Sequence, residues 1–154
     1  MSARGGAARV SSAVGRGLLS GVAGTAAMTV SSTVEMKLRG RAASDAPARA
    51  AAKVLGVEPV DDAARARFSN LVHWGYGTGW GAARGLLGAA GLRGAPAWAA
   101  FLASVWGSEL VMLPALGVAP PATQWGAREV AIDAWHHVVY ATATSLAYEA
   151  LDAR

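Results

Sequence analysis

Residues 69–92, SNLVHWGYGTGWGAARGLLGAAGL, decide the fold, because they hold seven glycines in 24 residues and yet fit no phosphate-binding loop. A dinucleotide-binding turn needs the pattern G-x-G-x-x-G. When the pattern starts at Gly75, Gly77 or Gly79, the residue at the place of its third glycine is Trp80, Ala82 or Arg84. The pattern of a P-loop, G-x-x-x-x-G-K-[ST], is absent as well. The glycines therefore need a different explanation.

Helical spacing explains the same glycines. Steps of four, four and three residues put them on one helix face, and such small-residue faces let membrane helices approach closely. The members of this stripe are Gly77, Gly81, Gly85 and Gly88. In water each glycine would destabilise a helix by about 1 kcal/mol relative to alanine, but in lipid the helix is favoured because unpaired backbone groups cost more. We predict a membrane helix over 69–92, with His73 at the head of its stripe.

The composition indicates lipid as the solvent. The chain of 154 residues is 53% hydrophobic and only 16% charged, whereas soluble domains carry about 25% charged residues. Long apolar segments recur along it, and a helix needs about 20 mainly apolar residues to cross a bilayer. We predict an all-α fold, an integral membrane four-helix bundle that forms a single domain over residues 1–154. The predicted helices cover about 14–37, 69–92, 95–118 and 125–151.

The first of these segments repeats the glycine arrangement. Gly17, Gly21 and Gly24 begin a face that continues to Glu35 in steps of three and four residues. We predict that these glycines also serve close helix packing. A secretory signal peptide is the alternative for this segment, because three arginines precede its apolar core and small residues follow it.

A longer connector, residues 40–67, joins the first two segments and is polar, basic and rich in alanine. Within it we predict a short amphipathic helix over 46–56 that lies on the surface, with Pro47 in its first turn and Gly56 at its end. The net charge is +4, and alanine rather than aromatic residues separates the basic residues, which favours anionic lipid over nucleic acid as the partner. The positive-inside rule places this connector in the cytoplasm and both termini outside.

Every predicted helix contributes an acidic or histidine side chain to the same half of the membrane. With a rise of about 1.5 Å per residue, four antiparallel helices bring these side chains to similar depths. Ionisable groups inside membrane helices are costly and usually functional. The candidate site consists of Glu35, His73, Glu109, Asp133, His136 and His137.

Carboxylates and imidazoles from several helices are the ligand set that builds metal sites in helix bundles. The chain has no cysteine, so a divalent metal here would be Zn, Fe or Mn. The E-x-x-H pattern of di-iron proteins is absent, since Met112 stands three residues after Glu109. Three other interpretations stay open: a proton or ion path, a haem held by His73 and His137, and a set of purely structural polar contacts.

No pair of nucleophile and base is apparent, and no serine stands in the pattern G-x-S-x-G. The sequence therefore favours a non-enzymatic role. The leading hypothesis is a small integral membrane protein whose buried Glu/His/Asp layer binds a metal ion or handles protons. The alternatives are a structural accessory subunit of a larger membrane complex and a haem- or pigment-binding electron-transfer subunit. The glycine faces also predict a homo-oligomer or a larger complex.

Three runs carry a resemblance to a known family. GLLSGVAGTAAMTV at residues 17–30, HWGYGTGWG at residues 73–81 and WHHVVY at residues 135–140 resemble small bacterial inner-membrane proteins of the YagU-like family. The resemblance implies a four-helix, multi-pass protein of the bacterial inner membrane. It also implies no assigned activity, a suggested link to acid tolerance and no functional residues to carry over.

Overall fold

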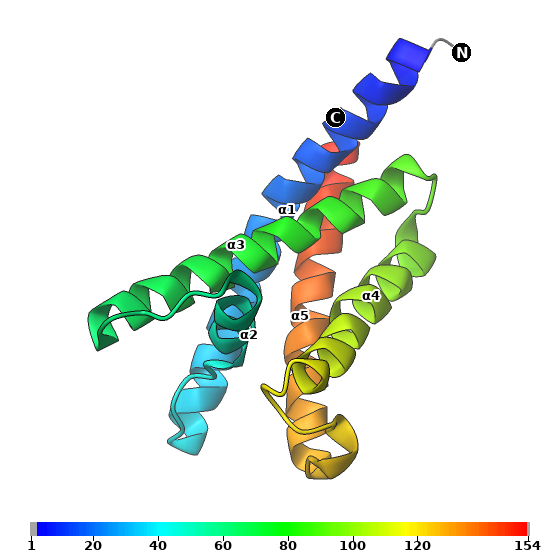
Figure 1. Ribbon diagram of the computed structural model, residues 1–154. Coiled ribbons are helices and arrows are strands. Elements are labelled where there is room, and N and C mark those ends of the chain that lie inside the picture. Colours follow the sequence, from blue (N-terminus) through cyan, green and yellow to red (C-terminus); the bar gives the residue numbers. More distant parts are fainter. Residues whose placement is uncertain (1–2, 154) are drawn as a thin grey trace.

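The structure is a computed structural model that describes residues 3–153. Within this range the chain forms five α-helices, one turn of 3-10 helix and no strand (Figure 1), so the expectation of an all-α fold is confirmed. The elements are α1 (Ala3–Arg39), α2 (Ala46–Leu55), α3 (Asp62–Ala89), α4 (Gly94–Ala115), η1 (Ala122–Gln124) and α5 (Ala127–Asp152).

Helix α1 is the central element, because both α3 and α5 pack extensively against it. Helix α4 packs on α5 and, over a smaller area, on α3. The long helices alternate in direction along the chain, so both termini lie at one end of the molecule (Figure 1). The α1–α2 and α4–α5 connections lie at the opposite end. We call this opposite end the connector end.

Helices α1 and α3 cross with their main chains in contact. A methyl group added at Gly17, Gly21 or Gly81 would overlap main-chain atoms of the other helix. A methyl group at Gly85 would likewise overlap the main chain of Ala13. The two glycine stripes therefore lie against each other, and only glycine permits this separation of the two helices.

The remaining stripe glycines face side chains instead of main chain. Gly77 lies against Thr25 of α1, while Gly24 and Gly88 lie against tyrosine rings of α5. Tyr140 also donates its hydroxyl hydrogen to the carbonyl oxygen of Gly77 at 2.5 Å. The glycines thus bring α1, α3 and α5 together at one crossing.

Helix α3 begins seven residues before the expected start at residue 69. The carboxylate of Asp61 accepts a hydrogen bond from the amide of Ala64 at 2.6 Å, which caps the helix. The alanine-rich run that follows is a good helix former. The connector consequently ends at Asp61 and not at residue 67.

The sequence predicted that the short helix α2 lies on the surface, but the structure shows it docked against the end of α4. Ala50 is buried in a small cluster with Leu113, in the last turn of α4, and Val118, which follows α4. Arg49 donates to the carbonyl oxygen of Val118 at 2.6 Å, and Lys53 donates to that of Leu116 at 2.7 Å. Alanine on the inner face allows this close approach, and the two basic side chains satisfy carbonyl groups left open where α4 ends.

Several polar side chains are buried beside the apolar core, and several large apolar side chains are exposed. The buried polar residues include Thr25, Arg84, His136, His137, Thr144 and Ser145. By contrast, Leu19 is 65% exposed, Val111 is 70% exposed and Leu146 is 63% exposed. Of the helices in the described part of the chain, two are long and apolar enough to cross a membrane, namely α4 and the Gly5–Arg39 part of α1.

Candidate metal centre

Three of the predicted site residues meet between α4 and α5. Asp133 and His137 are four residues apart and therefore share one face of α5, and Glu109 projects from α4 toward that face. Each of the three offers a ligand atom, and these atoms lie within 4.8 Å of one another. The group is an array of one buried imidazole and two partly exposed carboxylates.

The imidazole of His137 is held by one contact on each ring nitrogen. Its Nδ1 lies 2.9 Å from the main-chain oxygen of Asp133, and a carbonyl oxygen can only accept a hydrogen bond. Nδ1 therefore carries a proton. Its Nε2 lies 2.7 Å from Oε2 of Glu109. The ring is almost fully buried, whereas 24% of the Glu109 side chain and 26% of the Asp133 side chain are exposed, so access to the group is from the side of the two carboxylates.

Asp133 is positioned by a residue that the sequence analysis missed. Trp106 of α4 donates its indole hydrogen to Oδ2 of Asp133 at 2.7 Å, and the same oxygen lies 3.7 Å from Nδ1 of His137. The Trp106 ring also lies beside the His137 ring, with the centroids 6.5 Å apart. The available sequence signal was the spacing of three residues between Trp106 and Glu109, which places both on one helix face.

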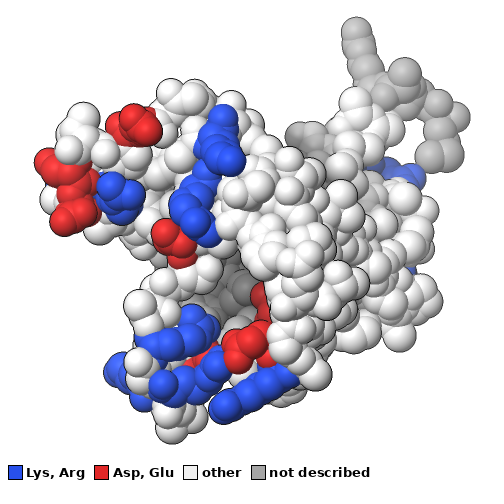
Figure 2. Space-filling model, turned by 60° about the horizontal axis from the view of Figure 1, so that its bottom comes forward, with Lys and Arg blue, Asp and Glu red and all other residues white. Residues whose placement is uncertain are grey.

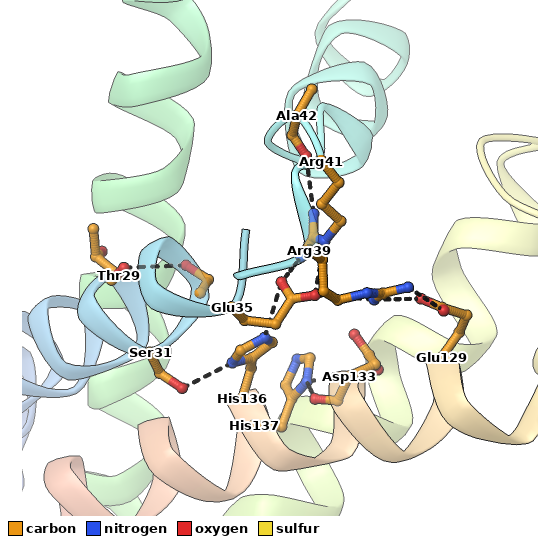
Figure 3. Close-up of polar contacts among 11 residues, drawn as sticks. Thr29, Ser31, Glu35, Arg39, Arg41, Ala42, Glu129, Asp133, His136 and His137 are labelled. Atoms are coloured by element: carbon orange, nitrogen blue, oxygen red, sulfur yellow. Dashed lines mark hydrogen bonds and ion pairs between the residues drawn. The ribbon is translucent and has the colours of Figure 1, made fainter. Parts of the chain in front are cut away.

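Glu35 and His136 form a different group at the connector end (Figure 3). Glu35 is paired with Arg39 at 2.9 Å and, at closer range, with Arg41. Arg39 also reaches Glu129 of α5 at 2.5 Å, which ties the end of α1 to α5. Two guanidinium groups thus surround the Glu35 carboxylate, and they compensate its charge. Such a carboxylate is a poor ligand for a cation.

The two remaining histidines bond to hydroxyl groups of α1. Nδ1 of His136 lies 2.9 Å from the Ser31 hydroxyl, and Nε2 of His136 lies 3.8 Å from Glu35. Nε2 of His73 lies 2.8 Å from the Thr29 hydroxyl. The single layer expected from the sequence is therefore divided into three groups, and Glu35, His73 and His136 lie outside the candidate metal centre.

A small cavity of about 80 Å³, partly open to the surface, nevertheless connects two of these groups. His73, Glu109 and His137 all line it, together with the rings of Tyr76, Trp80 and Tyr140. The space adjoins the Nε2 side of His137 and accommodates a metal ion with water. It is too small for a porphyrin, so the expectation of a haem between His73 and His137 finds no support in the geometry.

A second buried charge lies toward the other end of the molecule. Arg84 of α3 is 1% exposed. Its Nε donates to the Ser145 hydroxyl and its Nη2 to the Glu149 carboxylate, both at 3.2 Å. Its guanidinium carbon lies 4.5 Å from the centroid of the Tyr148 ring. Arg84 is therefore a paired, structural residue that joins α3 to α5.

The chain matches no family model, no curated protein and no solved structure in the comparisons made. The expected relation to YagU-like proteins is therefore carried by the quoted motifs alone. What the candidate centre does has to be argued from its own geometry.

Proposed function

We propose that this protein is an integral membrane protein whose four long helices cross the bilayer and whose Glu109, Asp133 and His137 bind a divalent transition-metal ion. The observation that carries the proposal is the convergence of these three ligand atoms within 4.8 Å of one another. No catalytic residues are assigned, in keeping with a non-enzymatic role.

The lengths of the helices support four crossings. The shortest of the long helices, α4, has 22 residues, and α3 and α5 have 28 and 26. At about 1.5 Å per residue, each exceeds the roughly 30 Å thickness of the hydrocarbon core. The exposed apolar side chains, such as Leu19, Val111 and Leu146, suit a lipid surrounding, because lipid offers no water to hydrate an outer polar face.

The donor set supports a divalent metal. Two carboxylates and one neutral imidazole balance the charge of a divalent cation, which matters in an interior where unpaired charge is costly. Without thiolates, the set suits Zn, Fe or Mn. The contacts around the ligands fit as well, since the main-chain partner of His137 Nδ1 leaves Nε2 to the metal, and Trp106 orients Asp133.

Proton handling is the second candidate, and the contact between Glu109 and His137 favours it. Nδ1 of His137 already donates to the main chain. When no metal is bound, a distance of 2.7 Å between Nε2 and Oε2 therefore implies one shared proton between the two groups. In proteoliposomes, decay of an imposed pH gradient that the Glu109→Gln variant abolishes would support this role. Wild-type protein with no proton flux at any pH would exclude it.

The orientation and location are proposed on the charge distribution and the resemblance. Lys and Arg side chains gather around the connector end (Figure 2), which the positive-inside rule places in the cytoplasm. The resemblance to YagU-like proteins adds the bacterial inner membrane as the location. The glycine stripes that predicted a homo-oligomer or a larger membrane complex are occupied by contacts within the chain, so that prediction no longer has them as its basis.

The metal assignment is tested by reconstitution. Purified protein in mild detergent is loaded with Zn, Fe or Mn, desalted and measured by mass spectrometry of the elements. We expect about one equivalent of metal in the wild type and a loss of at least tenfold in His137→Ala and Glu109→Gln. His136→Ala and Glu58→Gln are the matched controls, since Glu58 is an exposed carboxylate of the connector. Wild-type protein that retains no metal would overturn the assignment.

The membrane crossing is tested separately by cysteine labelling, which the cysteine-free chain makes clean. Single variants Ser44→Cys, Thr123→Cys and Ala90→Cys put a thiol at exposed positions of three connections. In oriented membrane vesicles, we expect an impermeant maleimide to label the first two from one side and the third from the other. Labelling of all three from the same side would contradict four crossings.

A further inference from the structure

An apolar cleft of about 320 Å³ opens between α2, α3 and α4. Its walls include Ala51 and Leu55 from α2, Val72 and Tyr76 from α3, and Met112 from α4. Among the described residues that line it, Glu109 alone carries a charge. The cleft is thus an apolar space with a single carboxylate.

This cleft adjoins the small cavity beside His137. Pro47, Tyr76 and Glu109 line both spaces, so Glu109 stands where the outer cleft meets the inner cavity. Aromatic rings are concentrated at the same place, because Trp80 and Tyr140 line the inner cavity. The connector end is also visibly hollowed, with both acidic and basic side chains around the hollow (Figure 2).

These walls select a particular chemistry. An apolar wall favours a ligand with an apolar body, and a partly buried carboxylate is stabilised by a cation placed beside it. Aromatic faces attract alkylammonium groups as well. The volume is at the small end of the range of about 300–1,000 Å³ that holds drug-sized ligands, so a body of about one ring fits.

We propose that this cleft binds a small lipophilic monocation, an ammonium group on an aromatic or alkyl body, with the Glu109 carboxylate as its counter-ion. Oε2 of Glu109 is already bonded to Nε2 of His137 at 2.7 Å, so the ammonium group pairs with the other carboxylate oxygen, to which a neutral lipid chain would offer no partner. The inference rests on the proposed function in one respect, since Glu109 is also a ligand of the metal centre. The lipophilic cation and the metal ion therefore compete for one carboxylate.

The test uses benzyltrimethylammonium as the probe and neopentylbenzene as its neutral isostere. Binding is measured by calorimetry on the full chain in zwitterionic nanodiscs, with empty nanodiscs as the blank. We expect saturable binding of one equivalent of the cation, no saturable binding of the isostere, and an affinity at least tenfold lower in Glu109→Gln. Glu58→Gln serves as the matched control and binds like the wild type. Saturating zinc raises the apparent Kd of the cation at least tenfold.

Two further variants separate this inference from the metal assignment. Ala51→Phe fills the cleft, and Leu55→Trp is a second filling variant on the exposed side of α2. Each should abolish cation binding while metal loading persists. His137→Ala should lose the metal and keep the cation. Loss of metal binding in the wild type with intact cation binding would overturn the proposed function alone.

Four results would overturn the cleft proposal itself. The first is no saturable binding of the cation by the wild type. The second is equal binding of the isostere with no effect of Glu109→Gln, which would make the cleft a slot for lipid chains. The third is binding that survives both filling variants, which would put the cation elsewhere. A wild-type protein that self-associates through this face would likewise leave no room for the probe, and analytical ultracentrifugation in detergent would reveal it.

Discussion

Nε2 of His137 lies 2.7 Å from Oε2 of Glu109, across the interface between α5 and α4. The contact joins the two helices through a carboxylate and an imidazole, each of which can bind a proton or a metal ion. It also joins the inner cavity to the outer cleft, because Glu109 lines both. The predictions that follow concern the residues that hold this pair in place and the helices that carry it.

Replacing Trp106 by phenylalanine removes the hydrogen bond to Asp133 and keeps an aromatic ring beside His137. We expect metal affinity to fall about 10- to 100-fold, as is usual when a group that orients a ligand is lost. Trp98→Phe is the control, because the Trp98 indole donates to Thr142 at 3.1 Å, away from the candidate centre. Competition with a chromophoric chelator measures both. Equal affinities in the two variants would remove Trp106 from the centre.

Neutralising Glu35 should leave metal loading unchanged. Its carboxylate is occupied by the guanidinium groups of Arg39 and Arg41, so Glu35→Gln removes a partner of these arginines and no ligand. Element analysis of reconstituted Glu35→Gln checks this directly. A loss of metal comparable with that in Glu109→Gln would restore Glu35 to the site and contradict the division into separate groups.

Adding one methyl group at Gly81 should weaken the α1–α3 crossing. The added carbon would overlap main-chain atoms of Gly17 and Gly21, and overpacking of this kind costs about 1–3 kcal/mol. Gly79→Ala is the matched control two residues away, because a Cβ there has no neighbour within 4 Å. Unfolding in increasing SDS, followed by circular dichroism, compares the two. Equal stability of the two variants would contradict a main-chain contact between α1 and α3 at Gly81.

Replacing Arg84 by lysine should destabilise the protein although the charge is kept. A lysine ammonium cannot bond Ser145 and Glu149 together and stack on the Tyr148 ring in the way the planar guanidinium does. The loss of buried hydrogen bonds is worth about 1–3 kcal/mol. Arg93→Lys is the control, because that side chain is 76% exposed. The same SDS titration serves here, and an unchanged midpoint for Arg84→Lys would show that the charge alone matters.

Local spacing in the sequence was sufficient to predict the helices and the faces on which their glycines lie. A step of three or four residues is a property of one helix, so it needs no knowledge of neighbouring helices. The structure places Gly17, Gly21 and Gly81 against main chain and Gly24 against a ring of α5. The start of α3 was predicted too late, because charged residues in its first turns look like connector while Asp61 caps them as helix.

The grouping of the ionisable residues could not be predicted from depth alone. Residue number gives the height of a side chain along a helix, but not which neighbour it faces. Glu35 lies at a similar height to the candidate ligands, and its two arginine partners, at four and six residues' distance, remove it from them. The contact between Glu109 and His137 depends on how α4 is rotated against α5, which no spacing within either helix reveals.

The docking of α2 has a consequence for how the cleft exchanges its contents with the surroundings. Helix α2 is both a wall of the cleft and the donor of hydrogen bonds to the carbonyl groups beyond α4, through Arg49 and Lys53. An outward movement of α2 would leave those carbonyl groups unpaired, so these two hydrogen bonds hold α2 against the end of α4. The hydrogen bond of Lys53 is exposed and that of Arg49 is partly buried. The Arg49 side chain is nevertheless 55% exposed, so water can reach both bonds.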